Sequence, residues 1–243
     1  MLNSNAMQTW ISLTLNDVRN VVRDRLLLMI FFVPAILLGF VRGIMPIVLE
    51  HYPNVAEYQH IILMLATAQI PTTFGLVAAF VMLDEKDERV FEVLRSLPVS
   101  SNRFIGFRLG WVFGFTALGA AIFLSFSGLM ELSLASILQA SLLYGILSVV
   151  LTLFIVTYTA NKVEGLAVFK GVNIAMYLPV LPWVWDNTWM QALAVMPSYW
   201  PFRIIGESLP TGDSPFIWFG IGVAVLVLIV ALLLTQFRKR VFG

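Results

Sequence analysis

The 243-residue sequence has no cysteine, only two histidines and only 12% charged residues. Without cysteine the chain has no disulfide, no thiolate metal ligand and no cysteine nucleophile. Soluble domains carry about 25% charged residues. The small charged share, with 59% hydrophobic residues and a mean hydropathy of +0.89, therefore excludes a water-soluble globule. A formal net charge of +1 gives no indication of a nucleic-acid partner.

Sequence motifs for chemistry are also missing. The apolar runs contain no paired aspartates, and no Gly-x-Ser-x-Gly or His-Glu-x-x-His element occurs. The two histidines, His51 and His60, flank a short connection, where a metal site is not expected. No Gly-x-x-x-x-Gly-Lys-Ser/Thr phosphate loop occurs either. We therefore expect no catalytic residue, metal site or cofactor site in this chain, which is not expected to be an enzyme.

Six long apolar runs are present instead. A helix needs about 20 apolar residues to cross a bilayer. Four runs meet this length without a charged residue, and two more are interrupted once, by Arg42 and by Lys170. These unbroken runs predict an all-α integral membrane protein with one six-helix domain over 26–243. The expected spans are about 26–49, 61–83, 104–130, 132–160, 165–185 and 215–237, with an outer segment at 186–214.

The positions of lysine and arginine predict the orientation, because basic residues near span ends are retained in the cytoplasm. With both termini inside, thirteen of the fifteen Lys and Arg residues are cytoplasmic, and only Arg42 and Arg203 are outside. Arg42 lies about 24 Å along its helix, where its side chain can snorkel to the outer interface. We expect Arg108 and Lys170 to snorkel to the cytoplasmic boundary in the same way.

Residues 1–25 precede the first span as a tail and a predicted amphipathic helix. Apolar residues from Met7 to Val22 recur at helical spacing, and polar residues occupy the other faces. A helix that is too polar to span, and that carries Trp10, should lie along the cytoplasmic membrane interface. The alternative is a leader that only directs topology.

The connection after the second span is the most charged stretch, with nine of the 29 charged residues between Asp84 and Arg103. Acidic residues at its start suit a helix N-terminus, and Pro98 would stop the helix. We therefore predict a cytosolic helix over about 84–97. Four apolar residues form one stripe on it, which should bury against the span ends or another subunit. They are Val90, Phe91, Leu94 and Leu97.

The segment from Leu94 to Ser100 reads Leu-Arg-Ser-Leu-Pro-Val-Ser, and Arg108 follows ten positions after its proline. Together with the acidic cluster, it resembles the coupling-helix region of ATP-binding-cassette (ABC) transporter permeases of the second type. The stretch from Glu85 to Arg95 is most similar to fluoroquinolone-exporter-like permeases, although many members have glycine at the position of Val90. Residues 1–25 resemble the family's elbow helix, and 196–201 resemble its partly re-entrant segment before the last span.

The resemblance implies a permease subunit of an exporter in the bacterial cytoplasmic membrane. A separate ATPase subunit would hold ATP and magnesium, and a second permease subunit would complete a homodimer or heterodimer. The ATPase-coupling residues implied here are Glu88, Val90, Phe91, Leu94 and Leu97. An aromatic-rich, nearly uncharged interior in contact with membrane lipid favours a hydrophobic or amphipathic substrate, such as a drug, an antibiotic or a lipid.

Polar residues inside two spans are candidates for the substrate path. Thr67, Gln69, Thr72 and Thr73 surround Pro71, and Asn173 and Tyr177 precede two prolines of the fifth span. Such hydroxyls can satisfy a carbonyl freed by proline, or they can face a cavity. The second and fifth spans line the path in the resembled family. We therefore take Gln69, Thr73, Asn173 and Tyr177 as candidate substrate-path residues.

Gly106, Gly110 and Gly114 have the spacing that allows close helix packing in lipid. The partner helix can belong to the same subunit or to a second one, and we favour packing within one subunit.

A secondary transporter or channel that is not driven by ATP is the alternative function. Secondary transporters generally carry ionisable residues within their spans and often have two similar halves. Here no span has a central carboxylate, and no repeat relates the first three spans to the last three. Drive from a separate ATPase subunit therefore explains the sequence better.

Overall fold

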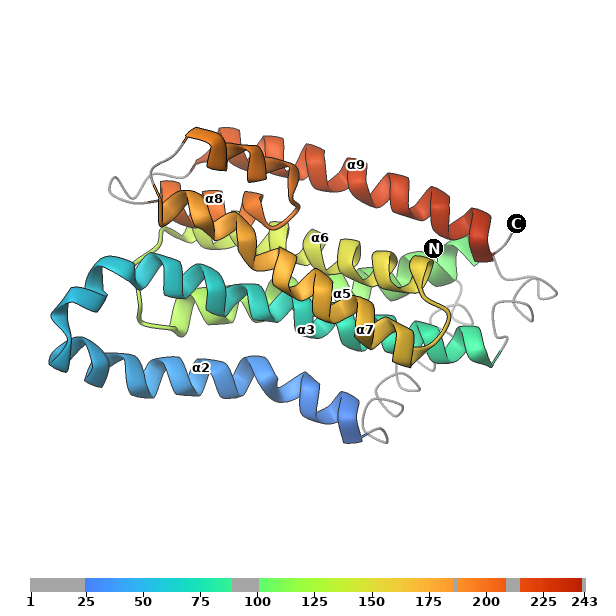
Figure 1. The fold of residues 1–243 in the computed structure, drawn as a ribbon, viewed down its shortest axis with the longest axis horizontal. Helices are drawn as coiled ribbons and strands as arrows, with labels where there is room; N and C mark the ends of the chain where they lie inside the picture. The colour runs from blue at the N-terminus through green and yellow to red at the C-terminus, as the bar shows by residue number, and fades with distance from the viewer. Residues whose placement is uncertain (1–24, 89–100, 186–187, 209–214, 242–243) are drawn as a thin grey trace, which may run out of the picture.

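The computed structural model describes residues 25–88, 101–185, 188–208 and 215–241 (Figure 1). Within these ranges the chain is helical and has no strand. The elements are α2 (Arg25–His51), η1 (Pro53–Tyr58), α3 (Gln59–Asp87), α5 (Ser101–Phe126), α6 (Leu134–Tyr158), α7 (Lys162–Tyr177), η2 (Leu178–Trp183), η3 (Thr188–Val195), α8 (Tyr199–Glu207) and α9 (Phe216–Val241). Six stretches are long and apolar enough to cross a membrane. The predicted all-α architecture with six spans is confirmed.

The long helices run side by side, and α6 is the most buried of the six spans (Figure 1). It packs against α3, α5 and α9. Its inward side chains include Leu143, Tyr144 and Leu147, which are almost completely buried. By contrast, α2 lies along one edge of the bundle, and Val41 is among its few buried side chains.

Two glycines allow α6 to approach its neighbours closely. A Cβ atom at Gly145 would lie 2.8 Å from the Phe113 ring of α5, and one at Gly75 of α3 would lie 3.1 Å from the carbonyl oxygen of Ser148. The Thr152 hydroxyl donates a hydrogen bond of 3.1 Å to the carbonyl of Gly75. In lipid, such small residues and interhelical hydrogen bonds hold helices together.

Three of the helix ends that differ from the predicted span ends have a local chemical reason. The third span ends at Phe126 rather than at 130, and it is followed by Gly128 in a left-handed conformation with φ +70°. The fourth begins at Leu134 rather than at 132, because Ser133 caps it by accepting a 3.1 Å bond from the Ser136 N–H. The fifth is α-helical only to Tyr177 rather than to 185.

Proline explains the early end of the fifth α-helix. Pro179 and Pro182 follow it, and a proline ring clashes with the carbonyl of the preceding turn and removes one donor. The chain continues as the 3₁₀ helix η2, so the apolar stretch still runs from Lys162 to Trp183.

The helix of the second span extends further than predicted, to Asp87. Asp84, Glu85 and Lys86 therefore form the last turn of α3, and the expected start of a separate helix at 84 is wrong. The remainder of that predicted helix, 89–97, lies outside the described residues, as does almost all of the predicted interfacial helix at 1–25.

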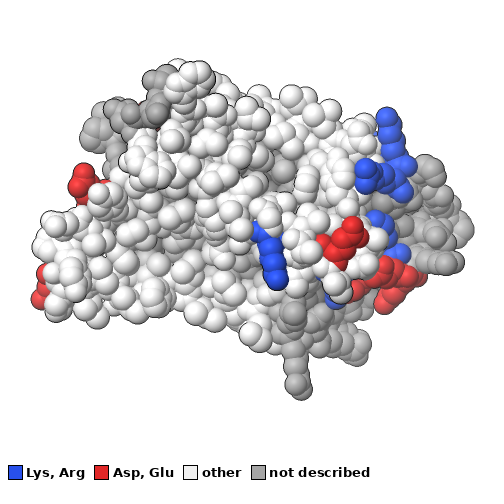
Figure 2. All heavy atoms as spheres, in the orientation of Figure 1, with Lys and Arg blue, Asp and Glu red and all other residues white. Residues whose placement is uncertain are grey.

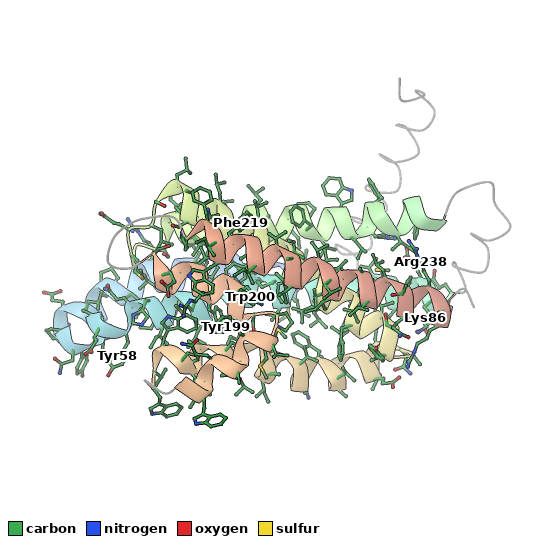
Figure 3. The ribbon with its side chains drawn as sticks, turned by 90° about the horizontal axis from the view of Figure 1, so that it is seen from above. Tyr58, Lys86, Tyr199, Trp200, Phe219 and Arg238 are labelled. Atoms are coloured by element: carbon green, nitrogen blue, oxygen red, sulfur yellow. The ribbon has the colours of Figure 1, made fainter. Side chains whose placement is uncertain are left out.

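The expected outer segment contains two short helices, η3 and α8. Trp200, Phe202, Ile204 and Ile205 of α8 are buried, and α8 packs against α6 and α9. Tyr199 and Trp200 point into the bundle beneath α9 (Figure 3). The segment that follows 196 therefore folds back into the protein.

Candidate functional site

Basic side chains gather at one end of the bundle (Figure 2). The C-termini of α3, α6 and α9 and the N-termini of α5 and α7 meet there. Lys86 and Arg238 lie at this end, which we call the basic end, and Tyr58 lies at the opposite, η1 end (Figure 3). The described basic residues at the basic end are Lys86, Arg108, Lys162, Arg238, Lys239 and Arg240.

Three consecutive residues in the last turn of α3 bind three different helices, and we call Asp84, Glu85 and Lys86 the α3 hub. A carboxylate oxygen of Asp84 lies 2.7 Å from Lys162 Nζ on α7. Glu85 forms an ion pair with Arg108 on α5. Lys86 Nζ donates to the carbonyl of Thr159, at 2.9 Å, and to that of Val156, at 3.3 Å, at the end of α6. The hub thus joins α3 to α5, α6 and α7.

The ion pairs of the hub differ in burial. The side chains of Arg108 and Glu85 are only 10% and 13% exposed, and the guanidinium also lies 5.3 Å from the Phe104 ring centroid. Lys162 and Asp84 are 31% and 45% exposed. Exposed pairs contribute about 0–1 kcal/mol, whereas breaking a buried pair costs about 3–5 kcal/mol. The expectation that Arg108 snorkels is therefore wrong, because Glu85 holds it inside the protein.

The C-terminal end of α6 is capped by its neighbours. The last carbonyls of a helix have no donor within the helix. Lys86 supplies two hydrogen bonds, and Arg240 of α9 supplies one of 3.4 Å to the carbonyl of Thr157. The Arg240 guanidinium also lies 4.7 Å from the Tyr158 ring centroid. Positive charge is favourable at the negative end of the helix dipole, so these two cations fix α6 to α3 and α9.

A second polar contact joins α3 to α7 deeper in the bundle. The Tyr177 hydroxyl donates a hydrogen bond to the side-chain oxygen of Gln69. Two threonines near Pro71 bond to their own helix instead, Thr67 to the carbonyl of Leu63 at 2.7 Å and Thr72 to that of Gln69 at 2.9 Å. Of the polar residues around the proline, only Gln69 is therefore seen to reach another helix.

The two contacts between α3 and α7 are separated by the same number of residues on both helices. Asp84 lies fifteen residues after Gln69, and Lys162 lies fifteen residues before Tyr177. Because the helices are antiparallel, Thr73, four residues after Gln69, lies level with Asn173, four residues before Tyr177. Thr73 is buried. The side-chain oxygen of Asn173 is buried with no hydrogen-bond partner among the described residues.

Tyr144 of α6 adds a polar group that the sequence did not suggest. Its side chain is fully buried, and its hydroxyl has no hydrogen-bond partner within the described part of the chain. Tyr144 lies in a run without charged residues, so nothing in the sequence pattern distinguishes it from a core residue. The four predicted residues lie along the contact between α3 and α7, and we call them the polar seam: Gln69, Thr73, Asn173 and Tyr177.

Comparison with known proteins identifies the family. The family described as fluoroquinolones export permease protein Rv2686c-like matches residues 17–234. Two proteins of Mycobacterium tuberculosis, from strains CDC 1551 / Oshkosh and ATCC 25618 / H37Rv, are each 31% identical to this chain over 237 residues. Each alignment covers 93% of this chain and 92% of the relative, and both relatives are named fluoroquinolones export permease proteins. The chain belongs to this export-permease family.

Membership agrees with the predicted resemblance to drug-exporter permease subunits. The permease is a multi-pass protein of the bacterial cell membrane, with six apolar helices. Among its described residues, no cluster of three or more His, Asp or Glu side chains is placed to hold a metal ion. The ion pairs and charged hydrogen bonds of the basic end hold neighbouring helices together.

Of the predicted ATPase-coupling residues, only Glu88 is described. It follows α3, is exposed, and donates its N–H to the carbonyl of Asp84 at 2.9 Å. Val90, Phe91, Leu94 and Leu97 lie outside the described residues. Sequence reasoning missed the hub itself, although the charged run directly after an apolar span was a signal for it.

The predicted packing glycines of the permease lie on an open face of α5. Gly106, Gly110 and Gly114 are exposed, and apart from the adjoining backbone of α5 itself no atom of the described chain lies within 4 Å of a Cβ built at any of them. The packing within one subunit that we favoured is therefore wrong for the described chain. A role for these glycines in contacting another subunit stays a prediction.

Proposed function

We propose that this permease is the membrane subunit of an ATP-driven exporter and is coupled to a separate ABC ATPase subunit. The observation that supports this most directly is the α3 hub. Its three residues come immediately before the segment predicted to contact the ATPase, and they bind α5, α6 and α7. A force applied to that segment would reach four of the six spans within one helical turn.

In the proposed cycle, ATP binding in the partner closes the ATPase dimer and moves the predicted coupling residues. The hub passes this movement to α7 through Asp84 and to α5 through Glu85. A shift between α3 and α7 would change the polar seam, which contains the candidate substrate-path residues. Alternating access requires such a difference in contacts between its two states.

The proposed orientation places the basic end in the cytoplasm, with both termini on that side. Basic residues near span ends are retained there, and among the residues that the structure describes only Arg42 and Arg203 lie toward the η1 end. The ATPase would then dock where ATP is available, beside the hub.

The proposed substrate is a hydrophobic or amphipathic drug. The two relatives are named for the export of fluoroquinolones, which supports testing this class first. We further propose that a second permease subunit, identical or different, completes the path.

Co-purification tests the coupling. We expect a neighbouring gene to encode the ABC ATPase. The permease is expressed with that ATPase, and Leu94→Asp is compared with the matched control Leu94→Met. We expect Leu94→Asp to remain in the membrane but to lose the ATPase, because a charge replaces part of the apolar stripe. Phe91→Asp should behave in the same way. Unchanged recovery of the ATPase with both aspartate variants would contradict the assignment.

Transport tests the energy source. Inverted membrane vesicles that contain both subunits should accumulate a fluorescent fluoroquinolone only when ATP is supplied. Accumulation that is independent of ATP and stops when an ionophore removes the proton gradient would support the secondary-transporter alternative.

A further inference from the structure

An open groove runs between α2 and α5 near the η1 end. Its volume is about 510 Å³, within the range of about 300–1,000 Å³ that is common for ligand sites. The walls are mostly apolar, and Arg42 is the one charged residue among them. The residues that line the groove are Ala35, Leu38, Gly39, Arg42, Ser125 and Phe126.

The groove reaches the membrane surface at Arg42. The apolar part of α5, Phe104–Phe126, has 23 residues, a length of about 34 Å that spans the hydrocarbon core, which is about 30 Å thick. Phe126 therefore lies at the edge of the hydrocarbon. The Arg42 guanidinium lies against Gly128, just beyond that helix end. On the depth set by α5, the charge reaches the level of the lipid headgroups, and the rest of the groove lies among acyl chains.

Arg42 differs from the other arginine at this end. Arg203 is paired with Glu207 at 2.7 Å and lies 4.5 Å from the Trp218 ring centroid. Arg42 is exposed, and it forms no ion pair or hydrogen bond within the described residues. A guanidinium with free donors matches the geometry of a phosphate, to which it can donate two parallel hydrogen bonds.

We propose that the groove between α2 and α5 binds an acidic phospholipid, with its phosphate on Arg42 and one acyl chain along Leu38 and Phe126. No described acidic side chain pairs with this positive charge, so a headgroup with a net negative charge is favoured over a zwitterionic one. Gly39 leaves room for the chain, because nothing lies within 4 Å of a Cβ at this position.

Native mass spectrometry of the intact permease in detergent tests this proposal, with phosphatidylglycerol and phosphatidylcholine of identical acyl chains as probes. We expect the parent protein to retain phosphatidylglycerol preferentially. Arg42→Gln should reduce that affinity about tenfold, equivalent to about 1.4 kcal/mol, and should abolish the preference. Gly39→Leu fills the groove and should reduce the binding of both lipids.

Two controls match these changes. Lys170→Gln removes an exposed cation of α7, and Gly43→Leu adds the same side chain at an open glycine of α2 that does not line the groove. Both should leave the lipid preference unchanged. The proposal is overturned if Arg42→Gln keeps the preference for phosphatidylglycerol. It is also overturned if Gly39→Leu changes the oligomeric state without changing lipid binding, because another protein chain would then occupy the groove.

Discussion

Replacing Arg108 with methionine should destabilise the permease by about 3–5 kcal/mol, because Glu85 would remain as a buried charge without a partner. The two side chains are only 10% and 13% exposed. The second carboxylate oxygen of Glu85 has no hydrogen-bond partner among the described residues. Among these residues, Arg108 is therefore the main group that neutralises the charge of Glu85. For a chain of this size, about 2–4 °C of melting temperature corresponds to 1 kcal/mol, and the expected loss is about 6–20 °C.

The double variant Glu85→Met with Arg108→Met provides the decisive comparison. It removes both charges and leaves neither of them buried alone, so it should lie within about 2 kcal/mol of the parent. Lys162→Met is the control within the hub. It breaks the more exposed pair with Asp84 and should cost less than about 1 kcal/mol.

Tryptophan fluorescence of the purified protein during heating measures all four melting temperatures. Equal losses for Arg108→Met and Lys162→Met would refute the argument from burial. A double variant that is no more stable than Arg108→Met would show that the loss does not come from leaving the Glu85 charge without a partner. The double variant also separates stability from transport. We expect it to fold but to export poorly, because it lacks the ion pair that joins α3 to α5.

Three further predictions concern helix contacts. Gly145→Leu should lower the melting temperature, since overpacking costs about 1–3 kcal/mol, whereas Gly110→Leu on the open face of α5 should not change it in a single subunit. Gln69→Ala leaves the Tyr177 hydroxyl without its acceptor, so the free energy of unfolding should fall by about 0.6–1.7 kcal/mol. The relative export rates of a panel of drugs should also change. Unchanged relative rates would argue against a substrate-path role. Lys86→Met should lower the free energy of unfolding by about 1.5–3 kcal/mol. It should also speed amide hydrogen exchange in the last turn of α6, and unchanged exchange would contradict the capping role.

The number and type of helices were predictable because bilayer thickness imposes a length on each apolar run. Helix ends were less predictable, because they depend on local chemistry that hydropathy does not register. Ser133, for example, begins α6 by capping it, and Pro179 ends the α-helical part of the fifth span. Both residues lie within or beside apolar runs, where the length rule alone extends the helix past them.

The contacts of the site were only partly predictable. Gln69 and Tyr177 were chosen as polar residues near prolines, and the structure brings them together across two helices. The glycines were misjudged because spacing alone does not say which face of a helix is inward. Gly145 has no glycine three or four residues away, yet a Cβ atom there would lie 2.8 Å from the Phe113 ring of the neighbouring helix. Facing direction depends on the tertiary packing of the whole bundle, which a local pattern does not contain.

Because the α3 hub contacts three other helices, the rotational positions of its side chains about the axis of α3 are constrained. Successive residues of an α-helix are rotated by about 100°, so three in a row point over an arc of about 200°. Inserting a single residue between Gln69 and Asp84 would turn all three hub side chains away from their partners at once, although hydropathy would barely change. An insertion of four residues would return them to within about 40° of their original directions, but one turn further along the axis. In this helix, the number of residues matters as much as their identity.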